Sequence, residues 1–306
     1  MREGIVTKAV GGFFFVYHEG RTYRCVARGK LRRRVAAGEA PGRIVPGDRV
    51  RFVPLSSEEG VIEEVLPRTQ QLTKPAAADP HRLQILAANV DQACVVFASR
   101  QPDPDPHAID RFLVLAEGSG LHPFLCFNKV DLGDPGELRA LYERIGYPVL
   151  RTSALTGEGL EVLREVLRGH LTVIVGPSGV GKSSLLNALL RTRRLRVGEV
   201  SPRTGRGRHT TTAAELVVVG EDAFVVDTPG VQVLEFVHLR PEEVGRCFAE
   251  IRERAEACAF GDCLHRAEPG CAVREAVETG QIPLSRYESY LRLLLEAEEA
   301  ERERYA

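Results

Sequence analysis

Residues 176–184, GPSGVGKSS, have the composition and order of a phosphate-binding loop. They follow the apolar run LTVIV and precede a helical stretch, which is the strand–loop–helix order that such a loop requires. Glycines let successive backbone N–H groups face phosphate oxygens, and the helix start adds its positive dipole end. Lys182 would contact the β- and γ-phosphates and assist catalysis, and the Ser183 hydroxyl would bind Mg²⁺. The expected phosphate-binding residues are Gly176, Pro177, Ser178, Gly179, Val180, Gly181, Lys182, Ser183 and Ser184.

A second motif, Asn128-Lys129-x-Asp131 in FNKVDL, has the residue types that recognise guanine. The Asp131 carboxylate can accept hydrogen bonds from N1–H and N2–H₂ of guanine, a pair of donors that adenine lacks. Asn128 would support the loop and purine N7, and the Lys129 stem would cover the ring. In the companion loop TSALTG, Ser153 and Ala154 would line the base, and the Ala154 N–H would meet guanine O6. We therefore expect GTP and GDP as ligands. An ATP-dependent or kinase-like enzyme is an alternative that requires Asp131 to have no role.

Two further segments would complete the magnesium and γ-phosphate site. The strand AFVVD leads into Asp227-x-x-Gly230, where Asp227 would hold Mg²⁺ largely through water and the Gly230 N–H would meet the γ-phosphate. The segment GRGRHTTT precedes the apolar strand ELVVVG, which comes just before AFVVD. A magnesium-dependent switch needs one threonine in this segment to contact the metal and the γ-phosphate. We assign that role to Thr211 by its offset from the strand, with Thr210 and Thr212 as alternatives.

The residue that orients the attacking water is not evident from the motifs. Val231 follows Gly230, at the position where Ras-like GTPases carry a glutamine. Since valine cannot orient water, we expect slow intrinsic hydrolysis. The missing group would be His209, as a catalytic residue, or a group of a partner; the alternative for His209 is a solvent-exposed loop side chain. The arginines between 191 and 208 would be solvated, contact RNA phosphates or reach the nucleotide.

Near the C-terminus, CAFGDCLHRAEPGC contains three cysteines and one histidine at close spacing. Three thiolates and one imidazole are a suitable set for a closed, tetrahedral zinc site, and a site with four protein ligands is structural. The alternative is four residues in a helical tail with no metal. The expected zinc ligands are Cys258, Cys263, His265 and Cys271. The other four cysteines, which we expect to be core thiols, are Cys25, Cys94, Cys126 and Cys247.

The order of the motifs along the chain is unusual. The guanine motifs come first, and the phosphate loop, the threonines and Asp227 follow. Nucleotide binding requires each loop at its place on the sheet, and the chain order can change if the original termini lie close together. The sequence therefore predicts a circularly permuted GTPase domain.

The elements that must position these motifs fall into three parts. Residues 1–66 contain short apolar runs separated by glycine, proline and charge, which predicts an all-β OB-fold barrel. Residues 67–82 have little periodicity and predict a linker. Strand and helix patterns alternate over 83–235, which predicts an α/β P-loop GTPase domain. Residues 236–306 predict a mainly α-helical, zinc-binding domain. The expected fold is therefore multidomain.

Composition and charge limit the partners and the compartment. The 306 residues are 43% hydrophobic and 27% charged, with a formal net charge of −1, so any nucleic-acid surface must be local. The predicted barrel contains the basic segment RGKLRRR at 28–34 and the aromatic residues Phe13–Phe15 and Tyr17. These residues suit RNA, because basic side chains contact the phosphate backbone and aromatic rings stack on bases. The alternative is that the barrel binds a protein. Nothing at the N-terminus resembles a signal peptide, and no apolar run approaches the ~18–20 residues of a membrane span. We expect a cytoplasmic monomer that does not enter a membrane.

Taken together, the motifs resemble one family, the circularly permuted, ribosome small-subunit-dependent GTPase A family of bacteria. The resemblance covers nearly the whole chain and rests on VPGDRV, FNKVDL, TSALTG, GPSGVGKSSLLN, GRGRHTTT, DTPG and CAFGDCLHRAEPGC in this order. It implies an OB-fold, a permuted GTPase and a zinc domain. It also implies a role late in assembly of the 30S subunit, contact with 16S rRNA, stimulation of hydrolysis by that subunit, and release on hydrolysis.

Two function classes remain from the residues alone. In the first, the chain is an enzyme used as a switch: GTP orders the threonine-rich segment, the protein binds rRNA, and hydrolysis releases it. In the second, the chain is an RNA-binding assembly module whose affinity is set by GTP and whose hydrolysis is incidental.

Overall fold

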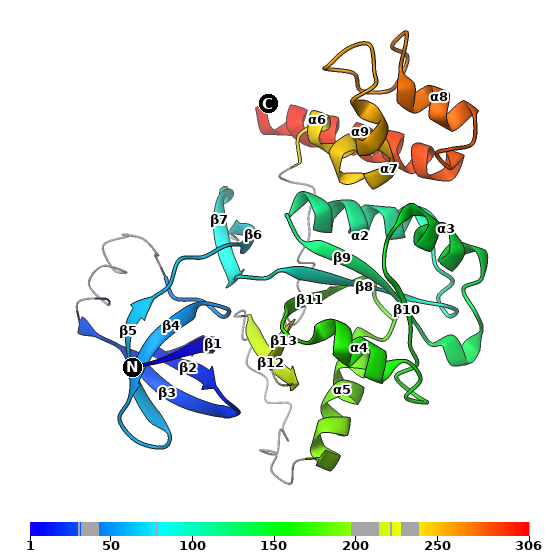
Figure 1. The fold of residues 1–306 in the computed structure, drawn as a ribbon. Coiled ribbons are helices and arrows are strands. Elements are labelled where there is room, and N and C mark those ends of the chain that lie inside the picture. Colours follow the sequence, from blue (N-terminus) through cyan, green and yellow to red (C-terminus); the bar gives the residue numbers. More distant parts are fainter. Residues whose placement is uncertain are drawn as a thin grey trace. The chain divides into compact units, whose positions relative to one another are not determined.

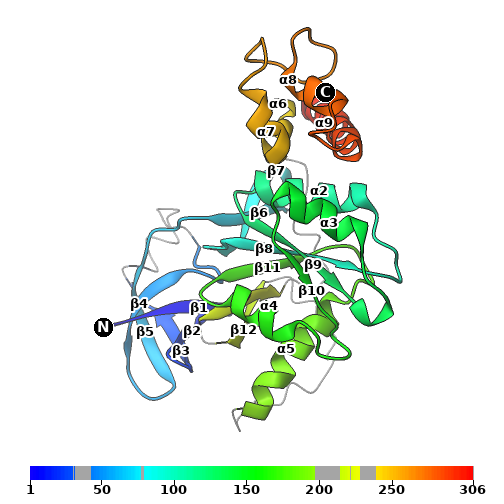
Figure 2. The ribbon, with the colours of Figure 1, turned by 45° about the vertical axis from the view of Figure 1, so that its right-hand side comes forward.

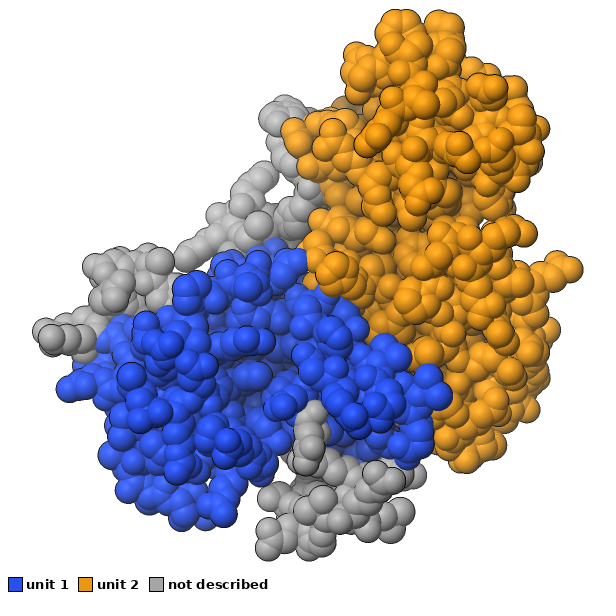
Figure 3. All heavy atoms as spheres, viewed as in Figure 1, with its two compact units in different colours: residues 1–92, 161–174, 186–233 blue, residues 93–160, 175–185, 234–306 orange. Residues whose placement is uncertain are grey.

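The computed structural model forms two compact units (Figure 3). The first unit comprises Met1–Gln92, Glu161–Ile174 and Leu186–Val233, and the second comprises Ala93–Leu160, Val175–Leu185 and Leu234–Ala306. The structure describes residues 1–29, 31, 43–76, 79–196, 214–220, 222–227 and 239–305.

The N-terminal part of the first unit is a closed five-stranded barrel, as the sequence predicts (Figure 1). Its strands are β1 (Arg2–Val10), β2 (Phe13–His18), β3 (Arg21–Ala27), β4 (Arg49–Pro54) and β5 (Glu59–Val65), hydrogen-bonded in the order β1-β2-β3-β5-β4. The β3–β5 pair is parallel and the other described pairs are antiparallel. Alternate apolar residues point inward, so Val6, Val16, Phe52 and Ile62 form a core with no exposed surface.

The segment expected as a linker, residues 67–82, contains strand structure. Strand β6 (Gln71–Ala76) pairs antiparallel with β7 (Asp79–Ala88), and the two form a separate two-stranded sheet. The segment is therefore not irregular throughout, and its role as a linker stays a prediction. Cross-strand pairing supplied hydrogen bonds that the weak periodicity of the sequence did not indicate. After β7, Asn89 has a left-handed backbone conformation with φ of 55°, and it separates β7 from the next strand along the chain.

The rest of the first unit includes three neighbouring strands, β11 (Leu171–Val175), β13 (Ala223–Asp227) and β12 (Glu215–Gly220). Strands β11 and β13 are parallel, whereas β12 and β13 form an antiparallel hairpin. Most of helix α4 (Leu160–Leu167) and the C-terminal part of helix α5 (Lys182–Arg196) also belong to this unit.

The second unit contains the strands that carry the guanine motifs. Strand β8 (Gln92–Ala98) is buried along its whole length, and β9 (His122–Asn128) pairs parallel with β10 (Val149–Arg151). Helices α2 (Pro106–Gly118) and α3 (Glu137–Ile145) lie on one face of these strands (Figures 1 and 2). Buried parallel strands are typically continuous apolar runs, which is why QACVVFA and HPFLCF were recognisable in the sequence.

The C-terminal part of the second unit is helical, as expected. Its helices are α6 (Pro241–Val244), the 3₁₀ turn η3 (Gly245–Cys247), α7 (Ala249–Ala255), α8 (Ala272–Glu278) and α9 (Leu284–Tyr305). Among the residues that the structure describes, no helix is both long enough and apolar enough to span a membrane.

A buried ionic cluster joins this helical part to α2 and α3. The guanidinium of Arg286 on α9 donates to Asp110 Oδ1 at 2.5 Å and to the two carboxylate oxygens of Glu250 at 2.6 and 3.2 Å. The Tyr142 hydroxyl donates to the same Asp110 oxygen, and the Arg286 guanidinium lies 4.5 Å from the ring centroid of Phe248. Arg286 and Asp110 have almost no exposed surface. The cluster therefore depends on complete pairing of its charges.

Candidate nucleotide-binding site and metal centre

The predicted phosphate loop links β11 to α5 and has the backbone conformation that its glycines allow. Gly176, Gly179 and Gly181 have φ values of 141°, 81° and 95°, respectively, a region that other residues rarely adopt. A Cβ atom at Gly176 would lie 2.1 Å from the Val96 carbonyl oxygen, and one at Gly181 would lie 2.4 Å from Asn128 Nδ2. Both glycines are therefore required by space as well as by backbone conformation.

Lys182, the first residue of α5, lies against this loop. Its ammonium group donates to the carbonyl oxygens of Gly176 and Pro177, both at 2.7 Å. Burial lowers the pKa of Lys182 from its ordinary value because the charged form loses hydration. Phosphate oxygens at this place would supply the opposite charge that offsets this cost. The next two residues, Ser183 and Ser184, are exposed at the helix N-terminus.

Asn128 brings the two guanine motifs and the phosphate loop together within the second unit. Its buried side chain donates from Nδ2 to the Val180 carbonyl oxygen at 3.0 Å. Its Oδ1 accepts from the Ala154 N–H at 3.2 Å and from the Thr152 hydroxyl at 3.4 Å. One amide thus fixes the positions of three loops that are far apart in the sequence. The contact of the Ala154 N–H with guanine O6 stays a prediction, since this N–H donates to Asn128 here.

Lys129 and Asp131 are held by the same loops. Lys129 adopts a left-handed conformation with φ of 62°, and its ammonium group donates to the carbonyl oxygens of Gly179, at 2.7 Å, and Gln101. The Ser153 hydroxyl donates to Asp131 Oδ1 at 2.5 Å and accepts from the Thr156 N–H at 3.1 Å. The orientation of the Asp131 carboxylate is therefore set by the TSALTG loop before any base is bound.

Several residues support the site without belonging to the expected binding residues. Thr152 is completely buried and bonds to Asn128, and Gln101 accepts from Lys129. The Ser99 hydroxyl donates to the Lys129 carbonyl oxygen at 2.7 Å. Ser99 and Gln101 follow strand β8 directly, and the carboxyl ends of parallel strands are where ligand sites form. Their place just after a buried strand was the feature of the sequence that could have indicated Ser99 and Gln101.

Other predicted site residues lie beyond what the structure describes. These are His209, the three threonines Thr210, Thr211 and Thr212, and Gly230. Asp227 is the last residue of β13, and only its backbone is described. The roles assigned to them stay predictions.

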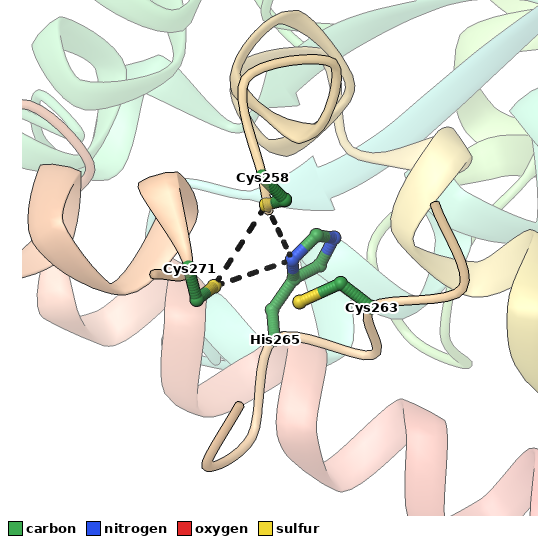
Figure 4. A group of neighbouring side chains, drawn as sticks. All are labelled: Cys258, Cys263, His265 and Cys271. Atoms are coloured by element: carbon green, nitrogen blue, oxygen red, sulfur yellow. Dashed lines mark hydrogen bonds between the residues drawn. The ribbon is translucent and has the colours of Figure 1, made fainter. Parts of the chain in front are cut away.

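The four expected metal ligands come together in the second unit (Figure 4). Their ligand atoms all lie within 4.8 Å of one another. His265 Nδ1 is 3.5 Å from both the Cys258 and the Cys271 sulfur atoms, and these two sulfur atoms are 4.0 Å apart. Ideal tetrahedral zinc with the usual bond lengths would place sulfur about 3.8 Å from sulfur and about 3.5 Å from nitrogen. The spacing of these three ligand atoms therefore fits one tetrahedral ion, and Cys263 lies close enough to be its fourth ligand.

The surrounding residues hold this cluster in shape. His265 has a φ of 57°, and its carbonyl oxygen accepts from the Tyr287 hydroxyl at 2.6 Å. The Glu268 carboxylate accepts backbone N–H groups of Leu264, Arg266 and Ala267 at 2.7–3.0 Å. Burial lowers the pKa of His265, which favours the neutral imidazole that a metal requires. The cluster can hold a metal, and its four protein ligands leave no place for a substrate at a tetrahedral ion.

The remaining cysteines are buried and free, as expected. They are Cys25, Cys94, Cys126 and Cys247.

The aromatic residues of the barrel divide into two kinds. Phe13 is 42% exposed, and the Arg24 guanidinium lies 5.2 Å from its ring centroid. Phe14 and Phe15 are partly buried, whereas Tyr17 is buried with its ring against that of Phe224 in β13. Of the basic segment 28–34, the structure describes only three residues. On the described barrel surface, Phe13 is thus an exposed ring with the Arg24 guanidinium over it, and Arg24 also pairs with the Glu59 carboxylate.

Comparison with known proteins extends these observations to the whole chain. Residues 65–237 match the family model of the RsgA GTPase, and residues 3–62 match that of the RsgA N-terminal domain. A relative from Moorella thermoacetica, named small ribosomal subunit biogenesis GTPase RsgA, is 43% identical over 98% of this chain and 99% of its own. A relative of the same name from Geobacillus kaustophilus is 42% identical over 98% of both chains.

Solved structures agree with this relationship. The crystal structure of YjeQ from Thermotoga maritima has a TM-score of 0.77 and 39% identity, and the match covers 97% of this chain and 98% of that one. The crystal structure of YloQ, described as a circularly permuted GTPase, has a TM-score of 0.74 and 32% identity, covering 97% and 95%. Permuted motif order, the loops joined by Asn128 and similarity over nearly the full length lead to one conclusion. The chain belongs to the RsgA GTPase family.

Proposed function

We propose that this GTPase acts late in maturation of the small (30S) ribosomal subunit, is activated by that subunit, and leaves it on hydrolysis. The relatives named above are biogenesis GTPases of the small ribosomal subunit, and they match this chain over almost its whole length. The observation that carries the guanine-nucleotide site is the Asn128 side chain, which bonds to both the phosphate loop and the loop of Ala154.

In the proposed reaction, water attacks the γ-phosphorus of GTP, the bond to the β-γ bridging oxygen breaks, and GDP and phosphate leave. Lys182 would neutralise charge on the β- and γ-phosphates. Ser183, Asp227 and Thr211 would hold Mg²⁺, Asp227 largely through water, and the Gly230 N–H would meet the γ-phosphate. His209, or a group from the ribosomal subunit, would orient the water. These roles follow from the motifs, and the positions of Lys182 and Ser183 at the start of α5 support them.

For the metal centre we infer one structural Zn²⁺ bound by Cys258, Cys263, His265 and Cys271. The ligand distances support this assignment, since three thiolates and an imidazole at tetrahedral spacing are typical of structural zinc. The ion would hold the loop between α7 and α8. No step of GTP hydrolysis passes through it.

We also infer how the chain is divided and what each part contacts. The proposed parts are an OB-fold domain at 1–66, a connecting segment at 67–82, the GTPase domain at 83–235 and the zinc domain at 236–306. The barrel would contact 16S rRNA, and the exposed ring of Phe13 supports a stacking contact. The protein would work in the cytoplasm as a monomer.

The test is GTP hydrolysis by the purified protein alone, with 30S subunits, and with 50S subunits as the control. The proposal expects that only 30S subunits raise kcat, by about tenfold or more. Cosedimentation with 30S subunits is measured with a non-hydrolysable GTP analogue and with GDP. If 30S binding is tight and kcat keeps its basal value, the chain is an RNA-binding module whose affinity GTP sets.

A further inference from the structure

The barrel contacts the β12–β13 hairpin at both ends of the hairpin, within the first unit. Near the hairpin turn, the rings of Tyr17 and Phe224 meet edge to face with centroids 5.4 Å apart. Both of these side chains are buried. At the open end of the hairpin, Lys8 Nζ on β1 donates to a carboxylate oxygen of Glu215 at 2.9 Å. The apolar contact and the ion pair together fix the hairpin against the barrel.

A β-bulge directs Lys8 to this contact. The register between β1 and β2 passes from Val6 opposite Val16 to Lys8 opposite Phe15, so Thr7 is the extra residue. The Thr7 hydroxyl donates to the Phe15 carbonyl oxygen at 3.2 Å. A bulge bends its strand and changes the direction of the side chains that follow. Lys8 therefore leaves the alternation that places Val6 in the barrel core.

Glu215 is connected to the predicted magnesium site by the hairpin itself. It is the first residue of β12 and pairs across the ladder with Asp227, the last residue of β13. Opposite residues of an antiparallel ladder are about 4.5–5.5 Å apart at Cα, so displacement of one moves the other. The chain also enters β12 from Thr210–Thr212, only a few residues before Glu215.

We propose that Lys8 and Glu215 are positioning residues for GTP hydrolysis, because their ion pair holds the open end of the β12–β13 hairpin and with it Asp227. The inference rests on the proposed role of Asp227 in binding Mg²⁺. The Lys8 and Glu215 side chains are 36% and 31% exposed. An ion pair of this kind contributes at most about 1 kcal/mol, which is a rate change of about fivefold.

The experiment measures kcat, KM for GTP and the Mg²⁺ concentration that gives half-maximal rate, in the protein without ribosomes. The variants are Lys8→Met, Glu215→Gln and the charge-exchanged pair Lys8→Glu with Glu215→Lys. Arg51→Met is the matched control, because Arg51 is a barrel cation of similar exposure that pairs with Glu3 and Glu64 inside the barrel. Thermal unfolding verifies that every variant is folded.

The inference expects each single variant to lower kcat three- to fivefold and to raise the required Mg²⁺ concentration by a similar factor. The KM for GTP should stay within about twofold, because the guanine and phosphate loops are intact. The charge-exchanged pair should regain most of the activity, and Arg51→Met should match the wild type. Raising the salt concentration should lower the wild-type rate toward that of Lys8→Met, since salt screens exposed charges.

The inference is overturned if the single variants keep the kcat and the Mg²⁺ dependence of the wild type. It is also overturned if the charge-exchanged pair has a kcat no higher than that of either single variant. Asp227→Asn in the same titration separates the two proposals. If Asp227→Asn keeps wild-type Mg²⁺ dependence, the assigned role of Asp227 fails, and the inference fails with it. If Asp227→Asn shows a strong defect and the Lys8 and Glu215 variants show none, only the inference fails.

Discussion

Replacing Arg286 with methionine should open the contact between α9 and α2. The variant keeps a side chain of similar length and leaves the Asp110 and Glu250 carboxylates buried without their cation. These two carboxylates lose three hydrogen bonds of 2.5–3.2 Å, and the contact with the Phe248 ring is lost as well. Removing one partner of a buried charge cluster costs about 3–5 kcal/mol, and we expect the free energy of opening of α2 and α9 to fall by an amount in this range.

Native-state hydrogen exchange resolved by peptide measures this loss directly, because it reports the free energy of opening for α2 and α9 separately. A global unfolding curve is less suitable in a chain of several domains. Arg302→Met is the control, since Arg302 lies on the same helix and is exposed. It should change the opening free energy by less than about 0.5 kcal/mol.

The pH dependence gives a second check on the same variant. Burial raises the pKa of Asp110 above its ordinary value, although Arg286 opposes the shift. Without Arg286 the pKa of Asp110 rises further. The destabilisation of Arg286→Met is therefore largest at neutral pH, where Asp110 is charged, and it shrinks as the pH falls through this raised pKa and the carboxylate is protonated. Adding Asp110→Asn and Glu250→Gln should recover at least about 2 kcal/mol, because no uncompensated charge remains. A loss below about 1 kcal/mol in Arg286→Met would refute the reasoning.

Three further perturbations address the two sites. Asp131→Asn should weaken GTP binding at least about 100-fold and favour xanthosine triphosphate, because an amide can donate to the xanthine C2 oxygen. Equal losses for both nucleotides, measured by competition, would exclude direct base recognition. Stripping the metal with a chelator, or Cys258→Ser, should speed hydrogen exchange in residues 258–271, and Zn²⁺ should restore protection only in the wild type. Exchange unchanged by the chelator would exclude a structural ion. Burial alone would raise the pKa of Glu268, but the backbone N–H groups that it accepts lower this pKa to about 2. The Glu268 carboxylate therefore stabilises the fold above its ordinary pKa and loses that effect as the pH falls from about 4.5 toward 2. The Tm advantage of wild type over Glu268→Gln should shrink in that window, and a constant difference would contradict the assignment.

The sequence by itself determined the class of the fold and predicted the chemistry of the sites. Each motif combines a few side chains, in the phosphate loop together with glycines, at fixed spacing, and spacing along the chain is preserved on folding. The buried strands before the FNKVDL and phosphate loops were also evident, because parallel core strands are continuous apolar runs. The three cysteines and His265 indicated a metal site for the same local reason, and their ligand atoms lie together.

Only the tertiary structure decided which residues support these motifs. Asn128 meets Val180, Arg286 meets Asp110, and Lys8 meets Glu215 across separations of 52, 176 and 207 residues. No local pattern encodes such pairs, since each depends on strand register and on helix packing. The β6–β7 hairpin was missed for the same reason, because cross-strand partners stabilise it more than its own propensity does. Local spacing thus specified the chemical groups, and long-range packing fixed their geometry.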